Sequence, residues 1–205
     1  MPFEVISVFI RNVDESLEKF VRARLALNDD LGDVTFETPT SNWSAQLSRI
    51  TVNLFLYDVG LSNQPSRTAL RRVTDDGTGQ RRAPQPMVRL GYLVSAWAGS
   101  PRDEHQLLGD LVSLFAAQPM IPTEFQVGNL SSNIQVRLCA DELNRPRDVF
   151  AGSGGQLKAS FALEATVAAD SYDWVEEAPA VERIEGMARP VPRGQMPTAA
   201  RRTPA

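Results

Sequence analysis

Residues 50–58 read ITVNLFLYD, and this stretch decides the fold because it has the pattern of a buried β-strand. Every second side chain on one face is apolar, and these side chains belong to Ile50, Val52, Leu54 and Leu56. Phe55 and Tyr57 make the opposite face partly apolar as well. A strand that is apolar on both faces is typical of the centre of a sheet that other elements cover.

Further strands are predicted on both sides of this one. Residues 87–97, MVRLGYLVSAW, form a second long strand whose one face carries Val88, Leu90, Tyr92, Val94 and Ala96. Residues 133–139 and 157–167 alternate in the same way, and residues 34–39 form a shorter strand that Pro39 ends. We therefore expect a mixed sheet of four or five strands.

Two amphipathic helices are predicted beside the sheet. Residues 3–27 form a long helix because their apolar side chains recur every three or four positions, at Ile6, Phe9, Ile10, Val13, Leu17, Phe20 and Val21. A second helix begins after Ser100, which is a suitable N-cap, and has Pro101 at its first position. Residues 141–150 are expected to form a short helix broken by Pro146. The predicted fold class is α/β, as a single domain.

Two segments lack the periodicity of regular structure. Residues 59–86 are rich in Asn, Ser, Asp, Gly and Arg, and we interpret them as a long exposed loop of the kind that often has a function. After Trp174 the composition changes to Pro, Ala, Glu and Arg, which cannot bury enough apolar surface to order a segment. We predict an α/β domain at residues 1–175 and a flexible tail at residues 176–205.

The composition favours a globular protein and argues against several other classes. The chain has 205 residues, of which 42% are hydrophobic, so a core can form without disulfides or metals. Its single cysteine, Cys139, suggests folding in a reducing compartment. Charged residues interrupt the first 20 positions too early for a signal peptide, and no apolar stretch approaches the length of a membrane span. The formal net charge of −4 argues against nucleic acid as the main partner.

The sequence offers few groups for catalysis, and we expect no enzyme activity, no cofactor and no metal. The single histidine, His105, follows Asp103 and Glu104 in the first turn of the predicted second helix. Carboxylates at that position are explained by the positive end of the helix dipole, and His105 needs no further cause. One histidine and one cysteine cannot supply a typical zinc site, and phosphate-binding glycine motifs are absent.

Five arginines in the predicted loop form a candidate surface for binding a partner: Arg67, Arg71, Arg72, Arg81 and Arg82. Arginine forms bidentate hydrogen bonds to carboxylates, so an acidic protein partner would suit them. The alternative interpretation is a solvated loop without a partner. Nucleic acid suits the arginines less well because no aromatic residues lie between them.

Three segments together carry a resemblance to a known family. They are TVNLFLYD at residues 51–58, then RLGYLVSAWA at 89–98 running into DEHQLLG at 103–109, and last the strand around FALE at 161–164. In this order they resemble the cap, or tail-terminator, family of extracellular contractile injection systems, which are phage-tail-like particles. The resemblance extends over residues 6–167.

This resemblance implies a structural protein rather than an enzyme. It implies a homo-oligomeric ring, expected to be a hexamer, that sits on the end of the inner tube, contacts the last layer of sheath protein and stops polymerisation. It also implies assembly in the cytoplasm as part of a particle that can be released from the cell. An adaptor elsewhere in the particle, such as the baseplate, is the alternative, and a small nucleic-acid-binding domain is a less favoured one.

Overall fold

The structure is a computed structural model that describes residues 9–28, 30–66, 68–139, 146–155 and 157–177. The elements in chain order are α1 (Phe9–Arg24), β1 (Gly32–Thr35), α2 (Ser41–Ser44), β2 (Ile50–Leu61), β3 (Leu70–Val73), β4 (Gly79–Arg82), β5 (Met87–Trp97), α3 (Pro101–Ala117), the 3-10 turn η1 (Thr123–Phe125), β6 (Gln135–Cys139), α4 (Pro146–Ser153), β7 (Ser160–Ala168) and β8 (Trp174–Glu176).

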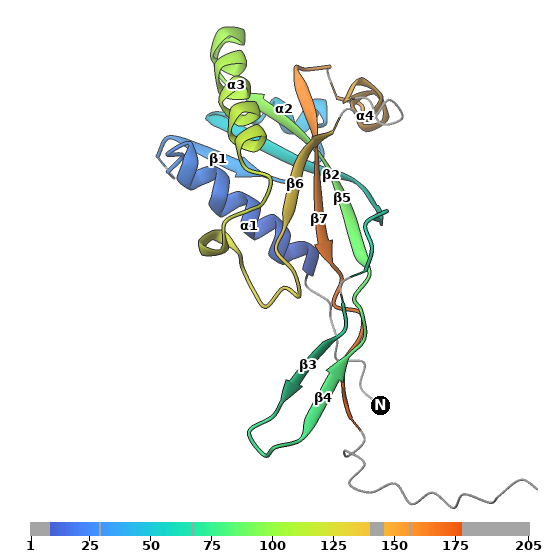
Figure 1. Cartoon of the computed structure of the whole chain (residues 1–205). Coiled ribbons are helices and arrows are strands. Elements are labelled where there is room, and N and C mark those ends of the chain that lie inside the picture. Colours follow the sequence, from blue (N-terminus) through green and yellow to red (C-terminus); the bar gives the residue numbers. More distant parts are fainter. Residues whose placement is uncertain (1–8, 29, 67, 140–145, 156, 178–205) are drawn as a thin grey trace, which may run out of the picture.

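The strands form two sheets of different size. The large sheet has five strands in the order β1-β2-β5-β7-β6, with β1 parallel to β2 and the other neighbours antiparallel. The small sheet has three antiparallel strands in the order β3-β4-β8. It projects from one end of the large sheet (Figure 1). We call the small sheet with its turn the arm, and the large sheet with its helices the body.

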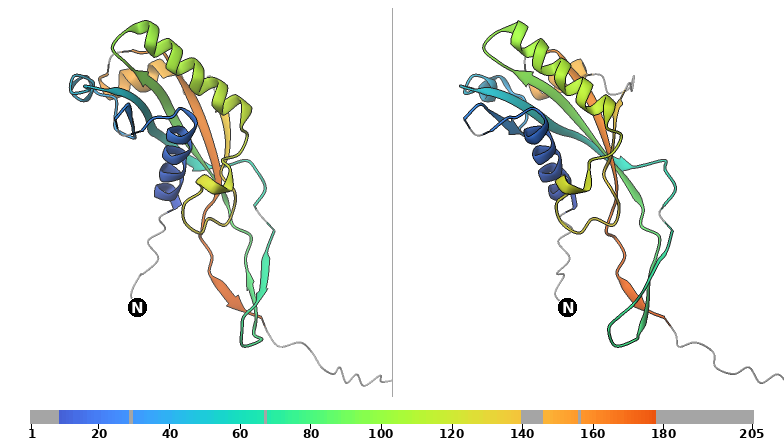
Figure 2. Two further views of the ribbon diagram at one scale, coloured as in Figure 1. Left: turned by 90° about the vertical axis from the view of Figure 1, so that its left-hand side faces the viewer. Right: turned by 60° about the vertical axis from the view of Figure 1, so that its left-hand side comes forward.

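The helices cover the large sheet on both faces. The long helices α1 and α3 lie on one face (Figure 2), where they enclose the main core. The shorter α2 and α4 lie on the opposite face and enclose a smaller cluster around Leu93, Trp97 and Phe150. Within this cluster the rings of Trp43 and Trp97 meet edge to face, with their centroids 5.2 Å apart.

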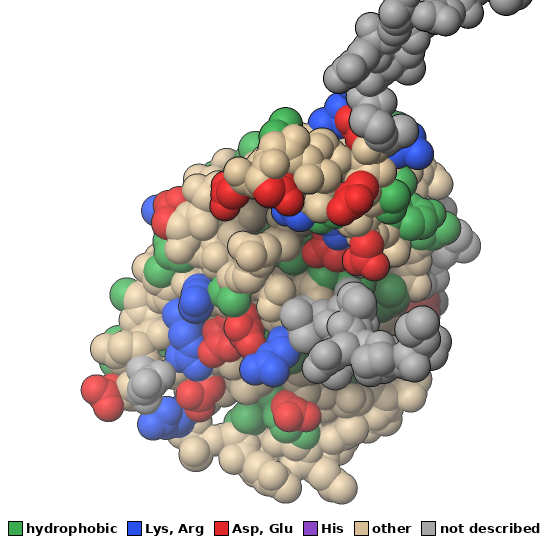
Figure 3. All heavy atoms as spheres, turned by 90° about the horizontal axis from the view of Figure 1, so that it is seen from below, with side chains coloured by type: hydrophobic (Ala, Val, Ile, Leu, Met, Phe, Trp, Pro, Cys, Tyr) green, Lys and Arg blue, Asp and Glu red, His purple; other side chains and the backbone are tan. Residues whose placement is uncertain are grey.

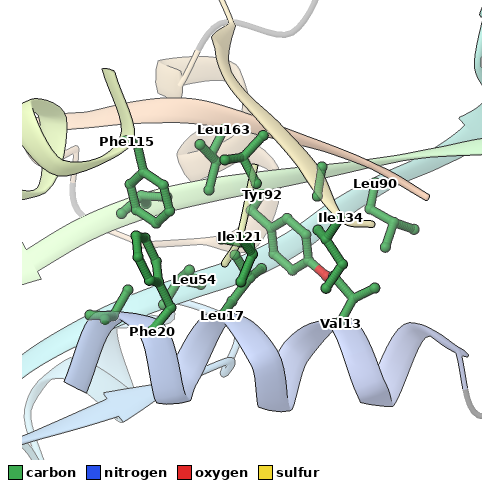
Figure 4. Packing of buried hydrophobic residues seen from close by; sticks show 14 of the residues in the cluster. Val13, Leu17, Phe20, Leu54, Leu90, Tyr92, Phe115, Ile121, Ile134 and Leu163 are labelled. Atoms are coloured by element: carbon green, nitrogen blue, oxygen red, sulfur yellow. The ribbon is translucent and has the colours of Figure 1, made fainter. Parts of the chain in front are cut away.

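The main core forms where the apolar stripe of α1 meets the central strands. Val13, Leu17 and Phe20 are spaced at i, i+4 and i+7, so all three point toward the sheet, and all are fully buried. Figure 4 shows them facing side chains of β2, β5, β7 and α3. The ring of Phe20 lies 6.0 Å from that of Phe115 in α3 and 5.5 Å from that of Phe125 in η1, measured between centroids.

The structure confirms the predicted α/β class, the mixed sheet and the two main helices. The helix predicted over residues 3–27 spans Phe9–Arg24, and its residues 3–8 lie outside the described residues. The second helix begins as expected, because the Ser100 hydroxyl accepts a hydrogen bond from the backbone N–H of Asp103. None of the helices in the described ranges is long and apolar enough to cross a membrane.

Two sequence predictions are wrong in detail. Residues 59–86 are not a loop throughout, because they extend β2 to Leu61 and then form β3 and β4. The part of the predicted helix 141–150 that the structure describes lies in α4, which begins at Pro146, and residues 141–145 lie outside the described residues. The short strand predicted at residues 34–39 is β1 at Gly32–Thr35, because its four residues are those that pair with β2.

Candidate interaction surface

The arm has two different faces because side chains alternate along each of its strands. The registers β3–β4 and β4–β8 place Leu70, Arg72, Gln80, Arg82, Trp174 and Glu176 on one face, which we call the tryptophan face. The same registers place Arg71, Val73, Gly79, Arg81 and Val175 on the other, which we call the valine face. The backbone N–H of Glu177 donates to the Gly79 carbonyl at 2.8 Å, so Glu177 continues the valine face.

A cation–π contact orders the tryptophan face. The guanidinium carbon of Arg72 lies 4.2 Å from the centre of the Trp174 ring. The Arg72 Nε also donates a hydrogen bond to the Gln80 side-chain oxygen at 2.9 Å. These contacts join all three strands across the face, since Arg72 belongs to β3, Gln80 to β4 and Trp174 to β8.

The valine face is more exposed. Val73 is 74% exposed and Val175 is 58% exposed, which is unusual for β-branched apolar side chains in a sheet. Arg71 pairs with Glu177 at 3.0 Å but keeps 80% of its side chain exposed. Arg81 is exposed between them, and the described part of the chain gives it no ion pair. This face therefore offers apolar and cationic side chains that the chain itself leaves uncovered.

The turn of the arm is held by its own side chains. Thr74 donates its backbone N–H to the Thr78 carbonyl at 3.0 Å, and Gly77 donates to the Thr74 carbonyl at 2.9 Å. Gly77 has a φ of 85°, which suits glycine in a hairpin of this type. The Thr74 hydroxyl and the Thr78 N–H both donate to the Asp76 carboxylate, and these bonds hold the pKa of Asp76 below its ordinary value.

A buried glutamine fixes the arm to the body. Gln85 is only 2% exposed and lies in the connection between β4 and β5. Its side-chain oxygen accepts from the backbone N–H groups of Ser171 at 2.8 Å and Tyr172 at 3.2 Å. Its side-chain nitrogen donates to the Tyr172 carbonyl at 3.1 Å. One amide therefore ties the connection β4–β5 to the connection β7–β8, and we call this junction the neck.

Arg82 completes the neck. Its Nη1 donates to the Ser131 hydroxyl at 2.7 Å, its Nη2 pairs with the Asp170 carboxylate at 3.2 Å, and its Nε donates to the Tyr172 carbonyl. The Ser131 hydroxyl in turn donates to the same carboxylate. Only 16% of the Arg82 side chain is exposed. Arg82 therefore links β4 of the arm to the body through Ser131, Asp170 and Tyr172.

The five predicted arginines thus fall into different environments. Arg67 lies outside the described residues. Arg82 is held in the neck, whereas Arg71, Arg72 and Arg81 lie on the arm. Acidic residues lie among them, and Figure 3, which views the molecule from below, shows basic and acidic side chains intermingled. Binding of an acidic partner through these arginines stays a prediction.

Sequence reasoning missed the arm as a folded element, and one signal was available. Residues 74–78 read TDDGT between two short stretches, and Asp-Gly in such a place favours a hairpin. No comparable signal marks β8, which has three residues and pairs with a strand more than 90 positions away. The role of Gln85 could not be predicted either, because only the fold brings it next to its hydrogen-bond partners Ser171 and Tyr172.

Charged side chains on one sheet face of the body form ion pairs. On the sheet face that carries α2 and α4, Arg137 makes two hydrogen bonds to Glu164, at 2.8 and 3.1 Å, and Arg89 pairs with Asp58 at 2.7 Å. His105 is exposed on α3. Among the described residues, no group of three His, Cys, Asp or Glu is placed to hold a metal ion. The arm is therefore the stronger candidate for a functional surface.

Comparison with solved structures gives matches of the same fold. The sheath/tube terminator of the PVC extracellular contractile injection system, in its extended state, matches with a TM-score of 0.63 and 18% identity, over 95% of this chain and 67% of that one. The tube-terminating cap of the anti-feeding prophage matches with a TM-score of 0.54 and 16% identity, over 87% of this chain and 60% of that one. The chain thus spans about two thirds of the length of these relatives.

Sequence comparison points in the same direction. No curated protein sequence matches the chain. The profile of the Pvc16 N-terminal domain family matches residues 12–183, a range that includes nearly all of the body and the whole arm. Because this match covers most of the chain, the protein belongs to the Pvc16 N-terminal domain family.

Proposed function

We propose that this protein is the structural terminator of a contractile injection particle. It forms a ring on the end of the inner tube, contacts the last layer of sheath and stops both polymers from growing. The observation that carries this proposal is the shared fold with a sheath/tube terminator over 95% of the chain. The family match over residues 12–183 supports the same assignment.

A closed ring meets the physical requirement for a terminator. Each growing end of a tube presents an unsatisfied subunit surface, and a cap must cover it without presenting an equivalent surface on its outer side. Heterologous contacts between neighbouring copies close into a ring and do not propagate along the axis. Six copies on a six-fold tube would combine many weak contacts into one strong attachment.

The two-part architecture suits this role. The body is a sheet with an apolar cluster on each face, so it can form a stiff ring subunit. The arm projects from the body and is held at a defined angle by Gln85 and Arg82 (Figure 1). A subunit of this shape can contact a neighbour or a second polymer at a distance from its own core. The ring works by binding and needs no chemical step.

The partners in this proposal are other copies of the chain, the inner-tube protein and the sheath protein. Assembly takes place in the cytoplasm, where the tube and sheath polymerise, and the cap leaves the cell only as part of the particle. The valine face of the arm, with its exposed Val73, Val175 and Arg81, is the surface best suited to these contacts.

Electron microscopy of particles from a strain that lacks this chain tests the proposal. We expect tubes or sheaths of uncontrolled length, or few stable particles, and recovery when the wild-type chain is supplied. A chain with the core substitution Phe20→Ala serves as the matched control, because it should not fold well enough to restore length. Particles of normal length and stability without the protein would contradict the terminator role and favour an adaptor.

A further inference from the structure

The arm has two open edges. In the order β3-β4-β8, the described residues give β3 a neighbour only on its β4 side, and they give β8 a neighbour only on its β4 side. An open edge presents unpaired backbone N–H and C=O groups, which readily pair with another strand. Both edge strands are short and charged, so they can accept only a partner strand of suitable charge.

The hydrogen-bond pattern identifies which backbone groups point outward. Thr74 bonds to Thr78 across the β3–β4 pair, and because bonding residues alternate in an antiparallel pair, Arg72 and Leu70 also face β4. Arg71 and Val73 then present their N–H and C=O groups at the outer edge of β3. The bond from Glu177 to Gly79 fixes the β8 edge in the same way, and there Trp174 and Glu176 point outward.

The two edges carry opposite charge. β3 reads LRRV, with two arginines and no acid, whereas β8 reads WVE and is flanked by Asp173 and Glu177. Pairing β3 with β3 would place arginines side by side, and pairing β8 with β8 would place carboxylates side by side. Like charges in opposite positions of two strands repel, so both pairings are unfavourable. Pairing β3 with β8 is favoured by charge. Within one chain Arg71 already pairs with Glu177 at 3.0 Å, so the charges available for a pair between copies are those of Arg72 and Glu176.

We infer that the arm joins neighbouring copies of this chain head to tail, with β3 of one copy pairing with β8 of the next. The inference rests on the proposed ring, and it assigns the contact between copies to the arm. Each copy gives its basic edge to one neighbour and its acidic edge to the other. Such a heterologous contact is the kind that closes into a ring.

Symmetry determines the direction of the new pair. Within one chain β3 and β8 run parallel, because each is antiparallel to β4. Rotation about a ring axis keeps the direction of a strand along that axis, so β3 of the neighbour also runs parallel to β8. In the matched register Leu70 lies beside Trp174 and Arg72 lies beside Glu176, all on the tryptophan face. An apolar pair and an ion pair then meet across the junction.

An engineered disulfide tests whether residue 72 of one copy lies beside residue 176 of the next. The full-length chain carries Cys139→Ser, so that its native thiol does not interfere, together with Arg72→Cys and Glu176→Cys. Within one chain positions 72 and 176 are two strands apart, on the order of 9.6 Å, which is too far for a disulfide. Oxidation of assembled particles should therefore link different copies, and gels should show a ladder of covalent oligomers that ends at the ring size.

The pair Gln80→Cys and Glu176→Cys is the matched control, since these residues are direct neighbours on β4 and β8. It should oxidise within one chain and give no ladder. If this control oxidises and the test pair forms no ladder, the inference is overturned. The terminator function would still stand if deletion of the chain disturbs particle length.

Val73→Pro provides a second test that spares the arm. The Val73 N–H points away from β4, so proline removes no hydrogen bond between the described residues but blocks the outer edge. We expect loss of the ring, whereas Val73→Thr, which keeps the N–H, should retain it. Intact rings with Val73→Pro would contradict the inference, and loss of the sheath layer from such rings would assign the edge to the sheath protein.

Discussion

The body and the arm are both β-sheets, but different forces hold them together. The body buries a continuous apolar cluster, in which Phe20, Leu54 and Tyr92 are fully inaccessible to solvent. The arm buries no large apolar side chain, and all four residues of β3 are exposed. Its strands depend on polar contacts at the neck and on the contact between Arg72 and Trp174. The comparison teaches that burial of apolar side chains stabilises the body, whereas a few specific polar contacts stabilise the arm.

The largest expected effect is a loss of stability of the body. Phe20→Ala removes a fully buried ring that packs against Phe115 and Phe125, and such substitutions cost about 3–5 kcal/mol. We expect the free energy of unfolding to fall by this amount in a denaturant titration. The matched control is Val175→Ala in the exposed arm, which should change it by less than about 0.5 kcal/mol. Similar losses for both variants would mean that the arm has a core of its own.

The second expected effect is a local loss of stability at the neck. Gln85→Ala leaves the N–H groups of Ser171 and Tyr172 without their acceptor, and an unsatisfied buried polar group costs about 1–3 kcal/mol. The loss should be local, because the core of the body is not touched. Hydrogen exchange should therefore accelerate in β3, β4 and β8 while the exchange of β2 and β5 stays unchanged.

Gln64→Ala is the control for the neck. Gln64 also makes a side-chain hydrogen bond, to Gln135 at 3.1 Å, but it is exposed, so water can replace the lost partner. Its substitution should leave exchange in the arm unchanged. Equal acceleration with Gln64→Ala, or none with Gln85→Ala, would show that the arm is fixed by something other than the buried amide.

The same contrast explains how much the sequence could predict. Residues 50–58 and 87–97 pack on apolar neighbours, so their alternation records which side is buried, and both strands were predicted nearly to their ends. The α1 stripe was visible for the same reason. Ser100 was predicted as a cap because its partner, Asp103, is three positions away. Burial and local hydrogen bonds leave a trace in the sequence.

The arm leaves little trace because its contacts are polar and distant in sequence. Arg72 contacts Trp174, which is about a hundred positions away in the sequence. Arg82 contacts Asp170, which is 88 positions away. Nothing in the order of residues distinguishes Arg82, whose side chain is mostly covered in the neck, from its exposed neighbour Arg81. The five arginines therefore looked equivalent as partner-binding residues. Only the fold separates those that hold the arm from those that remain available.

The third effect is smaller and probes a polar contact inside the body. Tyr92 is fully buried and its hydroxyl donates to the Asp14 carboxylate at 2.7 Å. Burial raises the pKa of Asp14 above its ordinary value of 3.8, although the bond from Tyr92 lowers it, and nearby Glu15 raises it further. The folded state thus binds a proton more tightly than the unfolded state, so Asp14 favours folding below pH 3.8 and loses this contribution as pH rises through its folded pKa.

Asp14→Asn tests this contribution. The amide oxygen can still accept the hydrogen bond from Tyr92, but the group no longer titrates. We expect the decline of stability from about pH 4 upward to become shallower in this variant. Unfolding titrations at several pH values measure it. Asp110→Asn, which changes an exposed carboxylate on α3, is the control, and a profile unchanged by Asp14→Asn would contradict the assignment.

The smallest expected effect concerns the arm, where Arg81 and Arg82 are adjacent but have different contacts. Arg81 is exposed and has no ion pair in the described part of the chain, so Arg81→Ala should change the free energy of unfolding by less than about 0.5 kcal/mol. Arg82→Ala removes hydrogen bonds to Ser131, Asp170 and Tyr172, and hydrogen exchange in β8 should accelerate clearly. A residue that contributes nothing to folding is free to contribute to binding. Particle length should therefore respond to Arg81 only through a partner, and a variant that folds normally but releases the cap would identify that contact.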